Sequence, residues 1–312
     1  MTSGCVNVAL LTLLALVTAC HGEPAPRHVT VFAAASMGQV LDQLREPFKA
    51  ICVDCDLRVE ISGSRVGVAK IADQHLPADL VITADADLID DVLRPEHTAF
   101  NAAFAVNALV LAVSPDSSVH AELARGSKWQ QVLLEPEVRI GHADPAQAPV
   151  GYRTLMALDL NDRVASDNLK TGAQIAARLD RKYMRDDVSK LTVALATNAV
   201  DVAFIYLSEA EQQSLQFVRL DPRIDFSDHT KNDVYATARY TTPALASYPA
   251  RNIRGTAALY GLTVPKNAEH PDMGYALARL LLSPKGREVA AKAHVTILSH
   301  PRVSGASALP LE

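Results

Sequence analysis

Several familiar signatures are missing from this 312-residue sequence, and each absence argues against a class of protein. There is no Gly-x-Gly-x-x-Gly pattern and no P-loop, so nothing indicates a glycine-rich phosphate loop. The net charge is −5 and the isoelectric point is near 6.1, whereas a general nucleic-acid binder would show a basic face. An anion site is still allowed, because neutral hydrogen-bond donors can build one without changing the net charge.

Signatures of hydrolases and zinc proteins are missing as well. A nucleophile elbow needs glycine two residues before and after its serine, but Ser64 has Ser62 and Val66 at those positions. The ten histidines show no spacing that identifies a catalytic partner, so we expect no enzyme; an exported hydrolase is the alternative. Cys52 and Cys55 form a Cys-x-x-Cys pair, but no second pair and no nearby His-x-x-x-His completes a zinc set.

The N-terminus predicts export. Residues 6–19 form an apolar run of about 14, shorter than the roughly 20 that a membrane-spanning helix needs. Small residues then precede Cys20, which resembles a lipobox, where the cysteine is lipidated and becomes the mature N-terminus. We interpret residues 1–19 as a signal peptide of the lipoprotein type and residues 20–27 as a tether. A plain cleaved signal peptide is the alternative, since residues 2–8 carry no Lys or Arg.

Export changes the interpretation of the remaining cysteines, Cys52 and Cys55. In the oxidising periplasm or at the cell surface, a disulfide between them is the expected state. Its loop is so short that it should stabilise the fold only a little. A redox motif is the alternative.

The rest of the chain is typical of an α/β protein with two lobes. A length of 312 residues with 49% hydrophobic and 21% charged residues fits two globular units of about 120–150 residues each. Short apolar runs alternate with helical spacing, which predicts mainly parallel sheets flanked by helices. The predicted strands are residues 29–32, 57–61, 80–82, 138–140 and 201–206. The predicted helices begin near Met37, Ser64, Leu88, Ala148 and Asp187, and a final one contains Ala276, Leu280 and Ala290.

Ser36 and Ser64 lie where predicted strands lead into helices. Ligands of such sheets bind outside the carboxyl ends of the strands, and helix N-termini favour anions because their N–H groups and dipole point the same way. Each serine could therefore offer a hydroxyl to an anion. Each could equally be an ordinary N-cap, for which Ser36 is the candidate. Pro47 should distort or end the helix that follows.

Motifs in the right order carry a resemblance to a known family. They are residues 31–36 (Val-Phe-Ala-Ala-Ala-Ser), 63–65 (Gly-Ser-Arg), 77–80, 83–85, 141–153, 204–208 and 260–268. The chain resembles the periplasmic molybdate/tungstate-binding proteins of ABC transporters over nearly its whole mature length, and is most similar to the archaeal-type subgroup. The resemblance implies a type II periplasmic-binding-protein fold, with the ligand between two lobes.

The resemblance also implies how the chain is divided. Residues 27–108 plus 258–312 would form lobe 1, and residues 109–257 would form lobe 2. The hinge would be two crossing strands, at residues 107–113 and 257–264.

The implied ligand site consists of hydrogen-bond donors from both lobes. Its residues are the hydroxyl donors Ser36, Ser64 and Tyr206, the backbone N–H donors Val150 and Val188, and the neighbouring Ala35 and Ala148. A fully ionised tetrahedral dianion has only acceptors, so a pocket of donors suits it.

One departure from the archaeal-type subgroup concerns its two metal-ligating carboxylates. They correspond here to Ala148 and Val188, which cannot ligate. We therefore expect no protein–metal bond. Asp187, one residue away, is expected to face away from the anion.

The resemblance thus implies a protein that captures molybdate or tungstate and delivers it to the permease of an ABC importer. We expect a monomer that needs no cofactor, binds no nucleic acid and contacts the membrane only through its lipid. The alternatives are a binder of sulfate, phosphate or vanadate, and a transition-metal carrier. A metal carrier would need a cluster of His, Glu and Tyr ligands, which a site made only of donors does not provide.

Cys20→Ser tests the lipid anchor. The substitution should release the protein from membranes or leave it unprocessed, because the thiol that takes the lipid is gone. Cell fractionation and the mass of the mature protein measure both effects. Wild-type protein that is wholly soluble and cleaved at another bond would contradict the lipoprotein interpretation.

Overall fold

The computed structural model describes residues 26–165, 168–244 and 249–306. The predicted signal peptide, Cys20 and most of the tether lie outside these ranges. Within them, no helix combines the length and the apolar composition that a membrane span requires.

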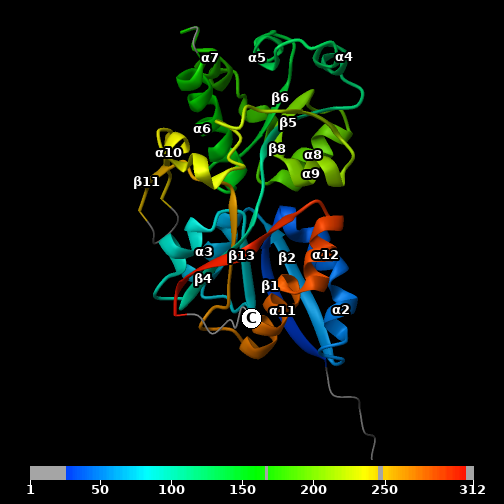
Figure 1. Cartoon of the computed structure of the whole chain (residues 1–312), viewed down its shortest axis with the longest axis vertical. Coiled ribbons are helices and arrows are strands. Elements are labelled where there is room, and N and C mark those ends of the chain that lie inside the picture. The colour runs from blue at the N-terminus through cyan, green and yellow to red at the C-terminus, as the bar shows by residue number, and fades with distance from the viewer. Residues whose placement is uncertain (1–25, 166–167, 245–248, 307–312) are drawn as a thin grey trace, which may run out of the picture.

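Two α/β lobes are stacked along the long axis of the molecule, as Figure 1 shows. The first lobe contains a six-stranded sheet in the order β13-β4-β12-β3-β1-β2, and the second a five-stranded sheet in the order β7-β6-β8-β5-β9. The strands of the first sheet are β1 (Arg27–Ala34), β2 (Cys55–Ser62), β3 (Leu80–Thr83), β4 (Phe100–Val106), β12 (Leu259–Thr263) and β13 (Thr296–Gly305). Those of the second are β5 (Leu109–Val113), β6 (Ile140–Ala143), β7 (Met184–Arg185), β8 (Val202–Tyr206) and β9 (Gln216–Arg219). A separate ribbon pairs β10 (Arg239–Thr242) with β11 (Arg251–Arg254).

Helices flank both sheets. Those of the first lobe are η1 (Ala35–Met37), α1 (Gly38–Gln43), α2 (Arg45–Lys49), α3 (Ser64–Ala72), η2 (Ile89–Leu93), α11 (Pro271–Leu282) and α12 (Pro284–Lys292). Those of the second lobe are α4 (Ser118–Ala124), α5 (Trp129–Val132), α6 (Pro149–Val164), α7 (Thr171–Ala177), η3 (Arg181–Tyr183), α8 (Val188–Ala196), α9 (Leu207–Gln212), η4 (His229–Lys231) and α10 (Asn232–Tyr235). The two-lobed α/β fold class expected from the sequence is confirmed.

The direction in which neighbouring strands pair in each sheet depends on where the chain crosses between the lobes. The βαβ units give the parallel pairs β1–β2, β1–β3, β6–β7 and β6–β8. In the two large sheets, every antiparallel pair includes β4, β5 or β12, the strands next to the two crossings. The reason is geometric for β5 and β12, which carry the chain into each lobe. A segment that arrives from the other lobe enters its sheet at the cleft, where the parallel strands end, so it must run against them.

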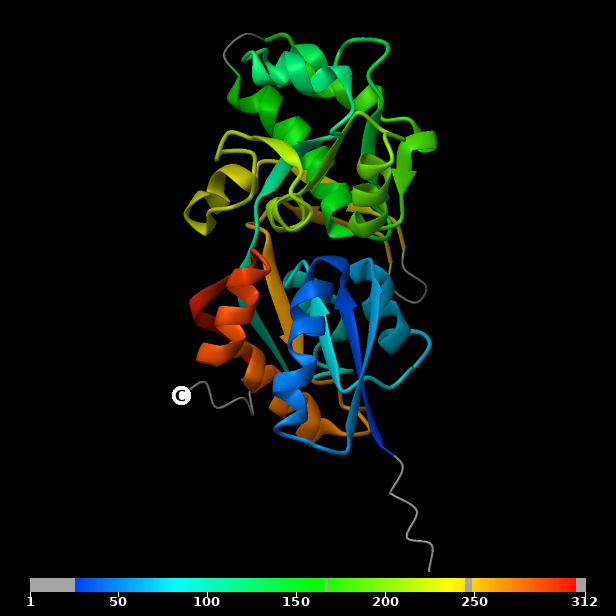
Figure 2. The same ribbon diagram turned by 90° about the vertical axis from the view of Figure 1, so that its right-hand side faces the viewer.

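The two crossings lie side by side between the lobes (Figure 2). The first leaves β4 through Asn107 and Ala108 into β5, and the second passes Ala257 and Ala258 into β12. The Asn107 N–H donates to the carbonyl of Ala258 at 3.0 Å, which joins the two crossings. The two crossings are therefore hydrogen-bonded to each other where the chain passes between the lobes.

Three local predictions need correction, and one strand was missed. Ser36 is not an N-cap, because it lies inside η1 and the cap position is Ala34. The predicted strand at residues 138–140 begins only at Ile140. The single final helix is two helices, since Ser283 caps α12 by accepting from the Gly286 N–H and Pro284 starts it. The strand β13 after it was not predicted. Pro47, in contrast, distorts its helix as expected. That helix is interrupted at Leu44, between α1 and α2.

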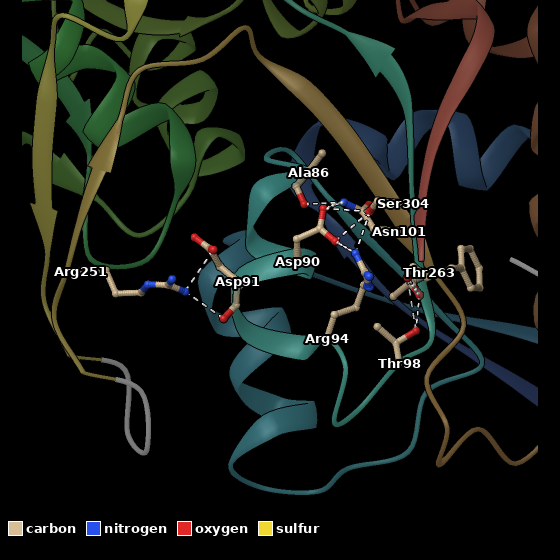
Figure 3. A network of polar contacts seen from close by, with 10 residues as sticks. Ala86, Asp90, Asp91, Arg94, Thr98, Asn101, Arg251, Thr263 and Ser304 are labelled. Atoms are coloured by element: carbon tan, nitrogen blue, oxygen red, sulfur yellow. Dashed lines mark hydrogen bonds and ion pairs between the residues drawn. The ribbon is translucent and has the colours of Figure 1, made fainter. Parts of the chain in front are cut away.

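Polar contacts join the helices and strands of the first lobe. Figure 3 shows Asp90 of η2 accepting hydrogen bonds from Asn101 of β4 and from Ser304 of β13, both at 2.8 Å. These bonds tie the C-terminal strand to the helix beside it. At the opposite edge of the same sheet, Cys52 and Cys55 are joined in a disulfide next to the start of β1.

Candidate functional site

All seven residues that the sequence assigned to ligand binding line one small cavity between the lobes. They are Ala35, Ser36, Ser64, Ala148, Val150, Val188 and Tyr206. The cavity has a volume of about 20 Å³, and Ser36, Ser64 and Tyr206 are each at most 3% exposed. So small a space accepts a ligand of only a few non-hydrogen atoms and excludes a sugar or a peptide.

Helix starts from both lobes converge on this cavity. Ser64 is the first residue of α3, Val188 is the first of α8, and Val150 is the second of α6. The N–H groups of the first helical turn have no partner within their helix. Three such starts therefore direct N–H groups and the positive ends of helix dipoles at one point, which favours a negative charge there.

The two serine hydroxyls are held as donors. Ser36 Oγ accepts a hydrogen bond from the Tyr260 hydroxyl at 2.7 Å, and Ser64 Oγ accepts from the Ala84 N–H at 2.9 Å. Neither serine caps its helix through its side chain. Because a hydroxyl has a single proton, filling its acceptor side with a buried donor leaves that proton available to a ligand.

Tyr206 is held in the same way, but by a cation. Its hydroxyl accepts from Arg153 Nη1 at 2.8 Å, and the same nitrogen donates to the Ala84 carbonyl at 2.8 Å. Burial raises the pKa of Tyr206 to about 12, although Arg153 opposes that shift. Tyr206 is therefore a neutral phenol whose proton can be donated.

Arg153 and Asp85 form a buried ion pair behind Tyr206. Their side chains lie 3.4 Å apart, and the Tyr152 hydroxyl donates to the same carboxylate. Burial disfavours the Arg153 charge, but Tyr206 and Asp85 raise its pKa, so the guanidinium stays charged. Because Arg153 and Tyr152 belong to the second lobe and Asp85 to the first, this pair also joins the lobes.

The residues at the carboxylate positions contribute no ligand. Ala148 and Val188 line the cavity with apolar side chains. Asp187 lines it too, although the sequence predicted that it faces away. Its Oδ1 accepts from the Lys190 N–H at 3.1 Å and from the Ser189 hydroxyl at 2.6 Å, which is the geometry of an N-cap for α8.

A larger cavity nearby is less suited to an oxyanion. Its volume is about 340 Å³, and it is lined by four carboxylates and three guanidinium groups, those of Asp85, Asp87, Asp90, Asp91, Arg65, Arg251 and Arg254. Asp85 raises the pKa of Asp87 to about 6, with burial adding to the effect. These two carboxylates thus repel each other, whereas among the described residues Asp187 carries the one carboxylate that lines the smaller cavity, so the smaller cavity is the better candidate.

Three residues that organise the site were not assigned a role from the sequence. Tyr260, Arg153 and Asp85 each lie in a motif that carried the family resemblance. All three are buried polar or charged residues. Their role could not be inferred, because the partner of each side chain lies far away in the sequence.

Comparison with known proteins first gives the class. The family model of the bacterial extracellular solute-binding proteins matches residues 29–295, and the chain belongs to this family. This family is extracellular, which implies a location in the periplasm or at the cell surface.

Two individual relatives and one solved structure then give a more specific comparison. The chain is 30% identical to the molybdate/tungstate-binding protein WtpA of Thermococcus kodakarensis over 299 residues, covering 88% of this chain and 83% of that protein. It is 27% identical to WtpA of Pyrococcus abyssi, covering 96% of this chain and 95% of that protein. The periplasmic molybdate-binding protein of Azotobacter vinelandii shares the fold, with a TM-score of 0.59 at 16% identity, over 87% of this chain and all of that one. The family resemblance noted in the sequence is confirmed.

The lobes touch directly at the cavity, and Gly63 permits the contact. The Arg65 N–H and its Nε donate to the carbonyls of Gln147 and Ala146, at 3.1 and 2.8 Å. A Cβ on Gly63 would overlap the Gln147 carbonyl. The Gly63 backbone (φ −58°, ψ 139°) suits any residue, so glycine is needed only for this close approach.

Gly63→Ala should therefore hinder closure of the lobes without strain in the first lobe itself. We expect anion affinity to fall at least tenfold, with a more extended scattering profile in the presence of ligand. Gly38→Ala is the matched control, because its Cβ would meet nothing nearer than Ile61 Cδ1 at 3.6 Å. Equal affinities for Gly63→Ala and wild type would show that this contact does not form in the bound state.

Proposed function

We propose that the protein captures molybdate or tungstate as a tetrahedral dianion between its lobes and delivers it to an ABC importer. The observation that supports this most strongly is the set of three buried hydroxyls, on Ser36, Ser64 and Tyr206. Each has its acceptor side occupied, so each offers a proton to the cavity. The names of the WtpA relatives supply the identity of the ligand.

The number of donors is sufficient for tight binding. Three hydroxyls and the N–H groups of Ser64, Val150 and Val188 give about six hydrogen bonds to a charged ligand. Each contributes about 1.5–3 kcal/mol. Their sum of roughly 9–18 kcal/mol can exceed the roughly 8 kcal/mol of micromolar binding after the cost of ordering and closing the lobes.

Cavity size should separate the possible oxyanions. Sulfate carries the same charge and the same four oxygens as molybdate but is smaller, so it would reach fewer donors at once. Phosphate retains a proton near neutral pH and would need an acceptor; of the residues that the structure describes, Asp187 is the one carboxylate that lines the cavity, and its Oδ1 already accepts two hydrogen bonds.

Further parts of the proposal concern the whole protein. We infer a monomer without catalytic activity or cofactor, anchored by a lipid on Cys20 and docking on an importer permease. Lobe 1 would be residues 27–108 plus 258–312, and lobe 2 residues 109–257. The sheet order supports this division, since β4 and β12 pair in one sheet while β5 pairs in the other.

Calorimetry with an anion panel on signal-less protein tests the ligand and the donors together. Molybdate or tungstate should bind more tightly than sulfate, phosphate or vanadate. Ser36→Ala and Ser64→Ala should each weaken binding about ten- to a hundredfold, since a charged hydrogen bond is lost. Asp187→Ala should change binding much less and instead destabilise α8 by about 1 kcal/mol. Tighter binding of sulfate would assign the protein to that anion.

X-ray absorption at the metal edge tests the coordination of the bound anion. Because Ala148 and Val188 cannot ligate, the metal should keep four short bonds to oxygen and no others. An octahedral spectrum would contradict this, as would complete loss of binding in Asp187→Ala. Both results together would indicate that Asp187 is a metal ligand.

A further inference from the structure

Glu209 is a buried acid that the proposed binding mechanism does not use. It lies in α9, directly behind the cavity, and is 5% exposed. Its Oε2 accepts from the Ser208 hydroxyl at 2.8 Å, whereas its Oε1 is buried and has no hydrogen-bond partner among the described residues. A buried carboxylate with a free oxygen is costly when ionised, so the neutral acid is favoured.

Hydrogen bonds connect Glu209 to the ligand-binding Ser36 through the hinge. The Asn107 Nδ2 group, at the first crossing, donates to the Ser208 hydroxyl at 2.8 Å and to the Tyr260 hydroxyl at 3.0 Å. Ser208 then donates to Glu209, and Tyr260 donates to Ser36. Both branches begin at the Asn107 amide. One ends at the Glu209 carboxyl and the other at the Ser36 hydroxyl.

The ends of the two branches, Glu209 and Ser36, also lie close to each other. The Ser36 hydroxyl lies close enough to Glu209 to lower the pKa of that carboxyl, but burial has the larger effect and raises the pKa to about 7. Ionised Glu209 is therefore a second acceptor for the single Ser36 proton. Neutral Glu209 can donate to the remaining lone pair of Ser36, which leaves the anion as the only acceptor for that proton.

The other titratable groups described around Glu209 would not bind the proton in its place. Tyr206 on β8 and Tyr260 on β12 face it, and burial raises the pKa of both, so both stay neutral. Strand β5 contributes no titratable side chain, and Lys190 on α8 is exposed and paired with Asp186. On α9 itself, Glu211 pairs with His294 at 3.2 Å.

We propose that Glu209 is a proton-binding site coupled to the anion site, so that the protein takes up its dianion together with one proton. This inference rests on the proposed function. A dianion near Ser36 repels ionised Glu209 and competes with it for the serine proton, and both effects favour the protonated acid. By linkage, protonation of Glu209 must strengthen anion binding to the same extent.

Calorimetry with sodium molybdate across pH tests the coupling in the full mature chain. Wild-type Kd should rise roughly 20-fold from about pH 6.5 to about pH 8.5, as an acid that titrates near pH 7 loses its proton. Molybdate itself stays fully deprotonated over this range. Titration in two buffers of different ionisation enthalpy should show uptake of nearly one proton at the higher pH and much less at the lower.

Glu209→Gln separates the coupling from the rest of the site, because glutamine is the neutral isostere. Its Kd should stay near the low-pH wild-type value at both pH values, with no proton uptake. Glu211→Gln, a carboxylate two residues further along the same helix, is the matched control and should keep the wild-type pH dependence.

Thermal unfolding of the unliganded protein gives a second measurement. The Glu209 pKa is raised on folding, so its contribution to stability is present below its unfolded value and is lost as pH rises through about 7. The wild-type Tm should therefore fall between about pH 6 and about pH 8.5 more than that of Glu209→Gln.

The outcomes distinguish the two proposals. Molybdate binding with a constant Kd and no proton uptake would overturn the coupling alone. Loss of binding in folded Glu209→Gln would also overturn it, since the neutral side chain is the state that the coupling requires. If no oxyanion bound wild type at any pH, the proposed function would fail as well.

Discussion

The whole site depends on the orientation of buried hydroxyl protons. A hydroxyl can donate or accept, so a pocket of serine and tyrosine side chains has no fixed preference for anions on its own. Here three hydrogen-bond donors remove the ambiguity. The Ala84 N–H, the Tyr260 hydroxyl and the Arg153 guanidinium each occupy an acceptor position on one of these groups. The anion preference therefore depends on the residues that donate to these hydroxyls.

That arrangement links recognition to closure. Arg153 orients Tyr206 within the second lobe and at the same time bonds to Ala84 of the first. Tyr260 orients Ser36 and belongs to a strand that continues one of the crossings. The groups that prepare the donors are thus also the groups that join the lobes. Opening the cleft would move the donors of the two lobes apart. It would at the same time break some of the hydrogen bonds that orient their protons.

Much of this could be predicted from the sequence. Alternation of strands and helices gave the fold class, and the motifs around Ser36, Ser64, Val150, Val188 and Tyr206 indicated the residues that line the cavity. Prediction failed where one or two residues decide whether a helix continues or ends. Ser283 and Pro284 do so by dividing the predicted last helix into α11 and α12. It also failed for Arg153 and Tyr260, because their partners are 53 and 224 residues away and only the folded chain brings them together.

The position of the first strand has a mechanical consequence. Strand β1 enters the first lobe at the end far from the cleft, beside the disulfide-closed loop, and runs toward the site (Figure 2). Arg27 at its start is bonded to Asp54 of that loop at 3.0 Å. Any load on the N-terminus therefore passes into the first lobe alone. The second lobe is joined to it by the two crossings and by contacts such as that of Arg153 with Ala84, so it can rotate while the first lobe is held still.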